Sequence, residues 1–154
     1  MDEAEFERAE LQGRALRDLL IVTQLASTRL SRALRSTPLS LTHVSLLSLL
    51  RRIPAGASVS EIAAAMEVNQ PAVSKSLRSL EQLGALRLER DPSDARRRVL
   101  RMTQVGHNLL DQAQMAMHPE ATAIFRDQSS AQLLRLVNEL EALQRTIETA
   151  GTPA

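Results

Sequence analysis

Residues 91–98 read Asp91-Pro92-Ser93-Asp94-Ala95-Arg96-Arg97-Arg98, a turn signal followed by three consecutive arginines. Leu86 and Leu88 alternate with charged residues before the turn, and a second short run, residues 99–102, follows it. This alternation on both sides of a turn predicts a β-hairpin. Guanidinium groups are planar, permanently charged and weakly hydrated, so they suit a phosphate backbone or a narrow minor groove. The stretch therefore predicts a cationic hairpin with double-stranded DNA as its leading partner.

Two short helices are predicted directly before this hairpin. Ser58 stands three residues before Glu61 at the start of an apolar pattern, which is the signature of a capping box. Residues 67–69 supply a tight turn, and Asn69 can cap a second helix that carries Pro71 in its first turn. Gly84 is placed to end that helix in a left-handed conformation. The spacing predicts a helix-turn-helix.

The second of these helices has the pattern expected of a recognition helix. Its apolar residues fall at helical spacing and face the core, which leaves a small and polar face outwards. Such a face can enter a major groove, where Ala72 would touch a thymine methyl, Gln70 and Lys75 would reach base edges, and Ser74 or Arg78 would hold phosphates. A plain helical hairpin on a soluble domain is the alternative. The predicted DNA-facing residues here are Gln70, Pro71, Ala72, Ser74, Lys75 and Arg78.

Charge is concentrated in the same part of the chain. The whole chain carries a formal net charge of only +1, which says little about nucleic acid. Residues 70–104, however, hold eight basic and four acidic side chains, while the remaining segments are neutral or acidic. A solvated charged face is the usual explanation for such a cluster. Its position directly after a helix-turn-helix pattern favours DNA binding instead.

These motifs together resemble the MarR family of winged helix-turn-helix transcriptional regulators. The resemblance rests on residues 58–63, on residues 70–84 and above all on the Asp-x-Arg pattern of Asp94-Ala95-Arg96, which leads through a short strand to Thr103-x-x-Gly106. Met102 stands where a leucine is common, and Arg98 is an additional wing arginine. The match extends over essentially the whole chain and is specific through its wing.

The resemblance assigns roles to the hairpin residues. In relatives of this kind, the arginine that corresponds to Arg96 enters the minor groove, and the aspartate that corresponds to Asp94 holds it by an ion pair. Arg97 and Arg98 would add contacts to the DNA backbone. We therefore expect Arg96→Ala to cost more affinity than Arg98→Ala.

Helical apolar stripes flank the predicted DNA-binding lobe, residues 40–103. They occupy residues 1–36 and 104–150, and one small winged domain cannot cover them. We expect these helices to form a homodimer, as the resemblance also implies, although they could instead form the core of a monomer. The predicted fold is mainly α with a small β-hairpin wing, in a single domain spanning residues 1–154. A two-fold dimer would read a pseudo-palindromic operator with half-sites about 10 bp apart or a small multiple of that spacing.

Other functional classes find little support in the sequence. There is no phosphate-binding glycine loop, no nucleophile elbow and no zinc-protease motif, so we expect no enzyme. The three histidines, His43, His107 and His118, are too scattered for a metal motif, and we expect no metal and no cofactor. With no cysteine, no secretory signal and no apolar run long enough to cross a bilayer, we expect a cytoplasmic protein without membrane contact.

A small-molecule effector is the remaining prediction. His43 lies on the predicted second helix, which in many relatives borders an effector cleft, so it is a candidate donor to a small apolar or aromatic acid. The sequence contains no Trp or Tyr and only two Phe, so Leu and Met would have to line such a cleft. We therefore expect a repressor that a ligand releases from DNA. The alternatives are a regulator or architectural DNA binder without small-molecule input, and a helical interaction module or an enzyme.

Overall fold

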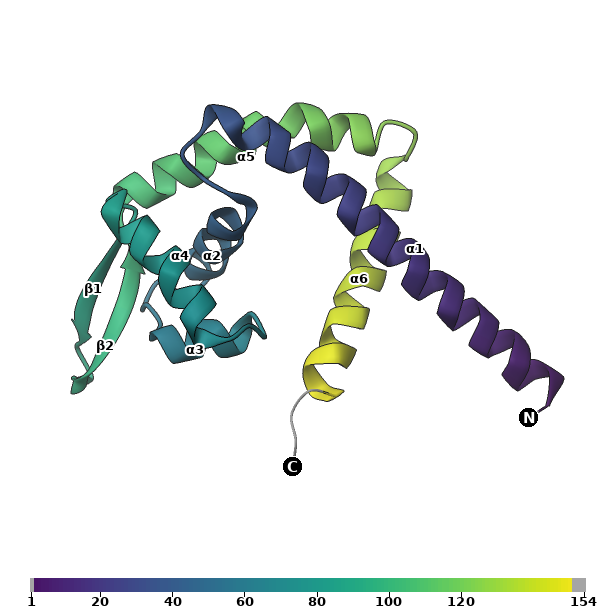
Figure 1. Cartoon of the computed structure of the whole chain (residues 1–154), viewed down its shortest axis with the longest axis horizontal. Coiled ribbons are helices and arrows are strands. Elements are labelled where there is room, and N and C mark those ends of the chain that lie inside the picture. Colours follow the sequence, from purple (N-terminus) through teal and green to yellow (C-terminus); the bar gives the residue numbers. More distant parts are fainter. Residues whose placement is uncertain (1, 151–154) are drawn as a thin grey trace. The chain divides into compact units, whose positions relative to one another are not determined.

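The computed structural model describes residues 2–150 and is mainly helical, with one two-stranded sheet (Figure 1). This confirms the predicted fold class of a winged helix-turn-helix with flanking helices. The elements follow one another as α1 (Glu3–Ala33), the 3-10 turn η1 (Leu34–Ser36), α2 (Leu41–Arg51), α3 (Val59–Ala65), α4 (Gln70–Gln82), β1 (Leu86–Asp91), β2 (Asp94–Met102), α5 (Gln104–Ile124) and α6 (Ser130–Ala150).

The chain divides into two compact units, residues 1–120 and residues 121–154. The first unit holds α1 to β2 and most of α5, and the second holds the end of α5 and α6. Each unit is described by itself below. The predicted single domain stays a prediction.

Local side-chain caps explain where the helices of the lobe begin. Ser58 accepts a hydrogen bond from the Glu61 amide, and the Glu61 carboxylate accepts one from the Ser58 amide, which confirms the predicted capping box of α3. Asn69 caps α4 through the Ala72 amide, at 3.0 Å. Between the two helices, Glu67 takes a positive φ of 50°, so the turn closes within residues 66–69.

The hairpin of β1 and β2 is anchored to the lobe at its base. Leu86 and Leu100 are buried in the core, and Leu100 also exchanges backbone hydrogen bonds with Ala57 in the loop before α3. Gly56 in that loop has a φ of +84°, and a Cβ there would lie 2.8 Å from the Leu100 carbonyl oxygen. Because the loop covers the strand, Val99 and Leu100 are both buried and the simple alternation of the sequence is lost at the base of the wing.

A second junction fixes the start of α5 against the end of α4. Gly84 ends α4 with a φ of +72°, as predicted, and its carbonyl accepts a 2.6 Å hydrogen bond from the Thr103 hydroxyl. The Thr103 hydroxyl in turn accepts from the Gly106 amide at 3.1 Å, so Thr103 caps α5 as predicted. These contacts hold the wing between two helices whose ends are joined.

The core of the first unit lies under the helix-turn-helix and excludes most of α1. Its largest fully buried side chains come from α2, α3, α4, β2 and α5, whereas α1 contributes no buried residue. The largest fully buried side chains are Leu46, Leu47, Leu50, Ile62, Leu77, Leu80, Leu110 and Val99.

Among residues 2–150, no helix is both long enough and apolar enough to cross a membrane.

Candidate nucleic-acid interface

The α4 helix presents the predicted polar face to solvent. Val73, Leu77 and Leu80 are buried with at most 3% of their surface exposed, which orients the helix on the core. The opposite face is therefore free, as helical periodicity requires. Of the predicted DNA-facing residues on this helix, Ser74 is half-buried and the others are exposed: Gln70, Pro71, Ala72, Lys75 and Arg78.

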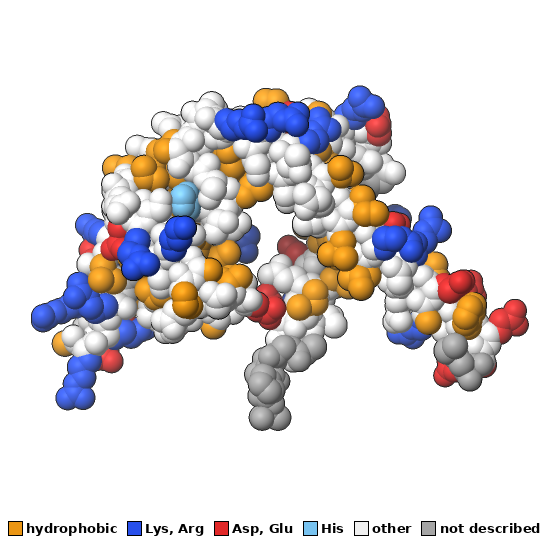
Figure 2. All heavy atoms as spheres, in the orientation of Figure 1, with side chains coloured by type: hydrophobic (Ala, Val, Ile, Leu, Met, Phe, Trp, Pro, Cys, Tyr) orange, Lys and Arg blue, Asp and Glu red, His pale blue; other side chains and the backbone are white. Residues whose placement is uncertain are grey.

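Three exposed arginines lie on one side of the outer wing, and we call them the wing arginine face: Arg90, Arg96 and Arg98. Arg90 is the direct cross-strand partner of Arg98, so their side chains share one side of the sheet. All three are exposed, and within the described part of the chain none has an ion-pair partner. In Figure 2, Lys and Arg side chains project from the hairpin at the lower left of the view.

Sequence reasoning missed Arg90 because only strand register places it beside Arg98. The two residues are eight positions apart in the chain, and an irregularity in the pairing follows Arg90. Like charges directly opposite each other weaken a hairpin. Their juxtaposition at an exposed strand pair is therefore more readily explained by an anionic partner than by stability.

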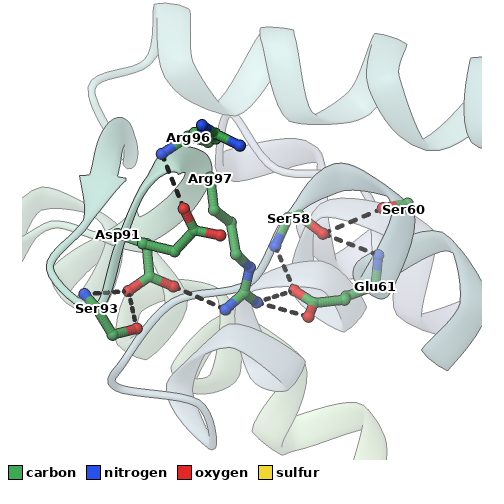
Figure 3. A network of polar contacts seen from close by, with 8 residues as sticks. Ser58, Ser60, Glu61, Asp91, Ser93, Arg96 and Arg97 are labelled. Atoms are coloured by element: carbon green, nitrogen blue, oxygen red, sulfur yellow. Dashed lines mark hydrogen bonds and ion pairs between the residues drawn. The ribbon is translucent and has the colours of Figure 1, made fainter.

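Asp94 has a different contact from the expected one. Its carboxylate accepts a 2.9 Å hydrogen bond from the backbone amide of Arg96, and in residues 2–150 it forms no ion pair with the Arg96 guanidinium. The interaction orients the backbone at the tip of the wing, as short polar side chains do in turns. The Arg96 side chain is left pointing away from the neighbouring polar network (Figure 3).

Arg97 is bound by two carboxylates, unlike its neighbours. Its Nη1 donates to Asp91 Oδ2 at 2.7 Å, and its Nη2 donates to both carboxylate oxygens of Glu61 in α3 (Figure 3). Asp91 is itself held by the amide and hydroxyl of Ser93, at 2.9 and 2.7 Å. The expected phosphate contact of Arg97 stays a prediction, and its guanidinium is already occupied.

The electrostatics of this network follow from its hydrogen bonds. The side-chain bond from Arg97, with further bonds from Ser58, lowers the pKa of Glu61 from the ordinary 4.5 to about 2. Hydrogen bonds from Ser93, with the nearby Arg97 charge, hold the pKa of Asp91 below its ordinary value. The Glu61 hydrogen bond, with the charges of both carboxylates, raises the pKa of Arg97. All three groups are therefore charged at neutral pH.

His43 serves a local purpose in the structure. Its Nδ1 accepts a 3.3 Å hydrogen bond from the Ser40 amide, and Ser40 accepts from the His43 amide, so the pair forms the capping box of α2. The side chain is half-buried, and desolvation lowers the pKa of His43. A neutral ring that accepts at Nδ1 carries its proton on Nε2. Its ligand-binding role stays a prediction, with Nε2–H as the available donor.

Metal binding has no geometric support in the described residues, since no group of three His, Asp or Glu side chains there could hold an ion. The candidate nucleic-acid interface consists of the exposed face of α4 and the wing arginine face described above.

Comparison with known families addresses the same part of the chain. Residues 37–97, which contain α2, α3, α4 and most of the hairpin, match the model of the MarR family. Over this segment, the chain is similar to members of the MarR family. The resemblance inferred from its motifs is confirmed.

Solved structures with the same fold include MarR-family regulators. CouR from Rhodococcus jostii RHA1, solved bound to p-coumaroyl-CoA, is 22% identical with a TM-score of 0.73, over 88% of this chain and 92% of that chain. A MarR-family regulator from Rhodococcus sp. RHA1 is also 22% identical, with a TM-score of 0.74, over 90% of this chain and 96% of that chain.

A third neighbour was solved with DNA. It is a mutant MarR from E. coli complexed with operator DNA, 17% identical with a TM-score of 0.69, over 93% of this chain and 99% of that chain. At these identities the likeness shows the fold alone. No curated protein matches the chain.

Proposed function

We propose that this protein is a sequence-specific, double-stranded DNA-binding transcriptional regulator and has no enzymatic activity. The observation that carries the proposal is the presence, on one MarR-like lobe, of an exposed polar face on α4 and a wing with three exposed arginines that have no ion-pair partner among residues 2–150. The E. coli MarR of the same fold was solved with operator DNA, which supports this use of the lobe. A cytoplasmic location belongs to the same proposal, because such a regulator acts where its operator lies.

The proposed division of labour follows the chemistry of the two surfaces. Residues of α4 would read base edges in the major groove, while Arg96 would enter the minor groove and Arg98, with Arg90, would neutralise phosphates. The α4 residues assigned to DNA are those exposed on its outer face together with half-buried Ser74. Asp94 would orient the wing tip through the Arg96 amide.

We propose further that the regulator is a homodimer formed through its terminal helices. Both α1 and α6 carry long rows of exposed apolar side chains, and contiguous apolar surface of this kind marks an interaction site. Two copies related by a two-fold axis would cover these rows and pair two recognition helices. The exposed apolar residues of α1 are Phe6, Leu11, Leu16, Leu19, Leu20, Ile21, Val22 and Leu25, and those of α6 are Leu134, Leu136, Val137, Leu140, Leu143 and Ile147.

Ligand-released repression is the proposed regulation. CouR, with the same fold, was solved bound to p-coumaroyl-CoA, the thioester of an aromatic acid, which supports a small apolar or aromatic acid as effector for this chain. Such a ligand could release DNA only by binding more tightly to a dimer whose recognition helices are wrongly spaced. A panel of aromatic acids and their thioesters, scored by melting temperature and by release of bound operator, tests this part. A regulator without small-molecule input is the outcome if none acts.

Selection of bound fragments from the source genome tests the central proposal. We expect enrichment of a pseudo-palindromic sequence, bound by one dimer. If each subunit neutralises three or four phosphates, the slope of log K against log salt is about −5 to −7. A slope near zero, or no duplex binding at low salt, would refute DNA binding.

A further inference from the structure

The three consecutive arginines of the wing are not equivalent. Arg96 and Arg98 are exposed and have no ion-pair partner in the described chain, whereas Arg97 is half-buried and engages two carboxylates. In the described chain, the side-chain hydrogen bonds of Arg97 go to Asp91 and Glu61. A guanidinium in this state carries little free positive charge to offer a phosphate, because releasing it would leave two carboxylates unpaired.

The two partners of Arg97 come from different parts of the lobe. Asp91 ends β1 of the hairpin itself, with only 11% of its side chain exposed, and Glu61 lies in α3, 36 residues away in the chain. Each carboxylate is already oriented, Asp91 by Ser93 and Glu61 by the Ser58 amide at 2.8 Å. Arg97 therefore joins two pre-arranged groups, a situation in which charge-assisted hydrogen bonds lose least entropy.

This link acts where the hairpin has least other support. The base of the wing is held by Leu86, Leu100 and the backbone pairing with Ala57. Farther out, Arg97–Glu61 is the one ion pair in residues 2–150 that connects the hairpin to another element. Two-stranded hairpins are marginally stable by themselves, so a tether near the tip has a large effect on where the tip lies.

We propose that Arg97 is a positioning residue, which bridges Asp91 and Glu61 to set the angle of the wing against α3 and makes no DNA contact itself. The proposal rests on the DNA-binding function given above, and it assigns the DNA contacts of the wing to the wing arginine face. With the tether in place, the wing arginine face is aimed before DNA arrives, which avoids an ordering cost on binding. Glu61, at the third position of α3, thereby couples the first helix of the helix-turn-helix to the wing.

Glu61→Gln tests the proposal, because glutamine also completes a capping box and leaves α3 capped. If Arg97 is tethered, the variant weakens operator binding although it removes a negative charge from the DNA-binding lobe. We expect about a tenfold loss of operator affinity. A loss of this size results when the fraction of protein with a correctly oriented wing falls to about a tenth. The salt slope stays unchanged, since no phosphate contact is lost. Glu67→Gln is the matched control, removing the same charge from the helix-turn-helix without breaking an ion pair, and should bind as the parent does or slightly more tightly.

Two further variants separate positioning from direct contact. Arg97→Ala should weaken binding with the same salt slope as the parent, and the Glu61→Gln/Arg97→Ala double variant should be no weaker than Arg97→Ala. The proposal is overturned if Glu61→Gln binds as well as or better than the parent while Arg97→Ala reduces the slope by about 0.9, because Arg97 would then be a phosphate contact.

Amide hydrogen exchange without DNA gives a readout that does not depend on the function. Glu61→Gln should raise exchange in the outer hairpin, residues 88–98, and leave α4 unchanged. If the parent protein binds no duplex, the proposed function fails, but this measurement still tests whether the Arg97–Glu61 ion pair holds the hairpin in place. Unchanged exchange in the hairpin would refute the positioning role even in a protein that binds DNA.

Discussion

Gly106→Ala should strongly destabilise the protein, because the first turn of α5 lies against the backbone that follows α4. A Cβ at Gly106 would stand 2.3 Å from the Ala85 carbonyl oxygen and 2.7 Å from Met102 Cγ. The same oxygen accepts a 3.0 Å hydrogen bond from the Thr103 amide. The methyl group can therefore be accommodated only by moving α5 or by lengthening that bond.

The cost combines two known effects. Overpacking of a tight contact costs about 1–3 kcal/mol, and a weakened hydrogen bond costs about 0.5–1.5 kcal/mol. We therefore expect a loss of about 2–4 kcal/mol, which for a chain of this size lowers the melting temperature by about 5–15 °C. Urea unfolding at matched protein concentration measures the change, since dimerisation makes apparent stability depend on concentration.

Two other glycines provide controls for the same chemical change. Gly84 has a φ of +72° with no atom within 4 Å of a Cβ, so Gly84→Ala should cost about 1–2 kcal/mol from backbone strain alone. Gly13 lies inside α1, and a Cβ there would also meet no atom within 4 Å. Gly13→Ala should therefore raise the free energy of unfolding by roughly 0.5–1 kcal/mol. The reasoning is refuted if Gly106→Ala is no less stable than Gly84→Ala.

Three further predictions concern the proposed function. Arg90→Ala should reduce the salt slope of operator binding by about 0.9, as Arg96→Ala should; an unchanged slope would leave Arg90 without a phosphate contact. Folding lowers the pKa of Glu61 from 4.5 to about 2, so the ionised carboxylate stabilises the folded protein fully above about pH 4.5. This stabilisation is lost as the pH drops towards 2. Glu61→Gln should therefore make the stability of the protein depend less on pH between 4.5 and 2, measured by circular dichroism during acid unfolding. Leu20 on α1 is 62% exposed, so its burial in a symmetric dimer would contribute about 1 kcal/mol or more per subunit. Two subunits together give about 2 kcal/mol, so Leu20→Ala should raise the dimer dissociation constant, measured by sedimentation, by about thirtyfold. Unchanged dimerisation would exclude Leu20 from the interface.

Signals that act over three or four residues made much of the fold predictable. The spacing of Ser58 and Glu61, the position of Asn69, and Gly84 after the last apolar residue of α4 each specify a helix end through bonds within one turn. The part that His43 plays in the cap of α2 was missed, although it is equally local, because histidine at the third position is not the usual acidic or amide partner of a serine cap. The Asp-x-Arg pattern of the wing, together with the helix-turn-helix before it, carried the resemblance to the MarR family.

Roles within the wing could not be assigned in the same way. Arg96, Arg97 and Arg98 are chemically identical and adjacent, so only the family resemblance set Arg96 apart, and nothing in composition or spacing separated Arg97 from Arg98. Strand register brought Arg90 beside Arg98, and the packing of the hairpin beside α3 brought Glu61 to Arg97. Both relations join positions that are distant along the chain.

Helix caps, turns and apolar periodicity are local properties of the chain, and they were sufficient to predict a helix-turn-helix, a cationic wing and apolar flanking helices. Long-range packing, in contrast, sets which arginines face outwards and which one is held by carboxylates. An arginine is available to a partner only when no carboxylate lies within hydrogen-bond distance of it. Folding sets those distances between residues such as Glu61 and Arg97, which no local pattern connects.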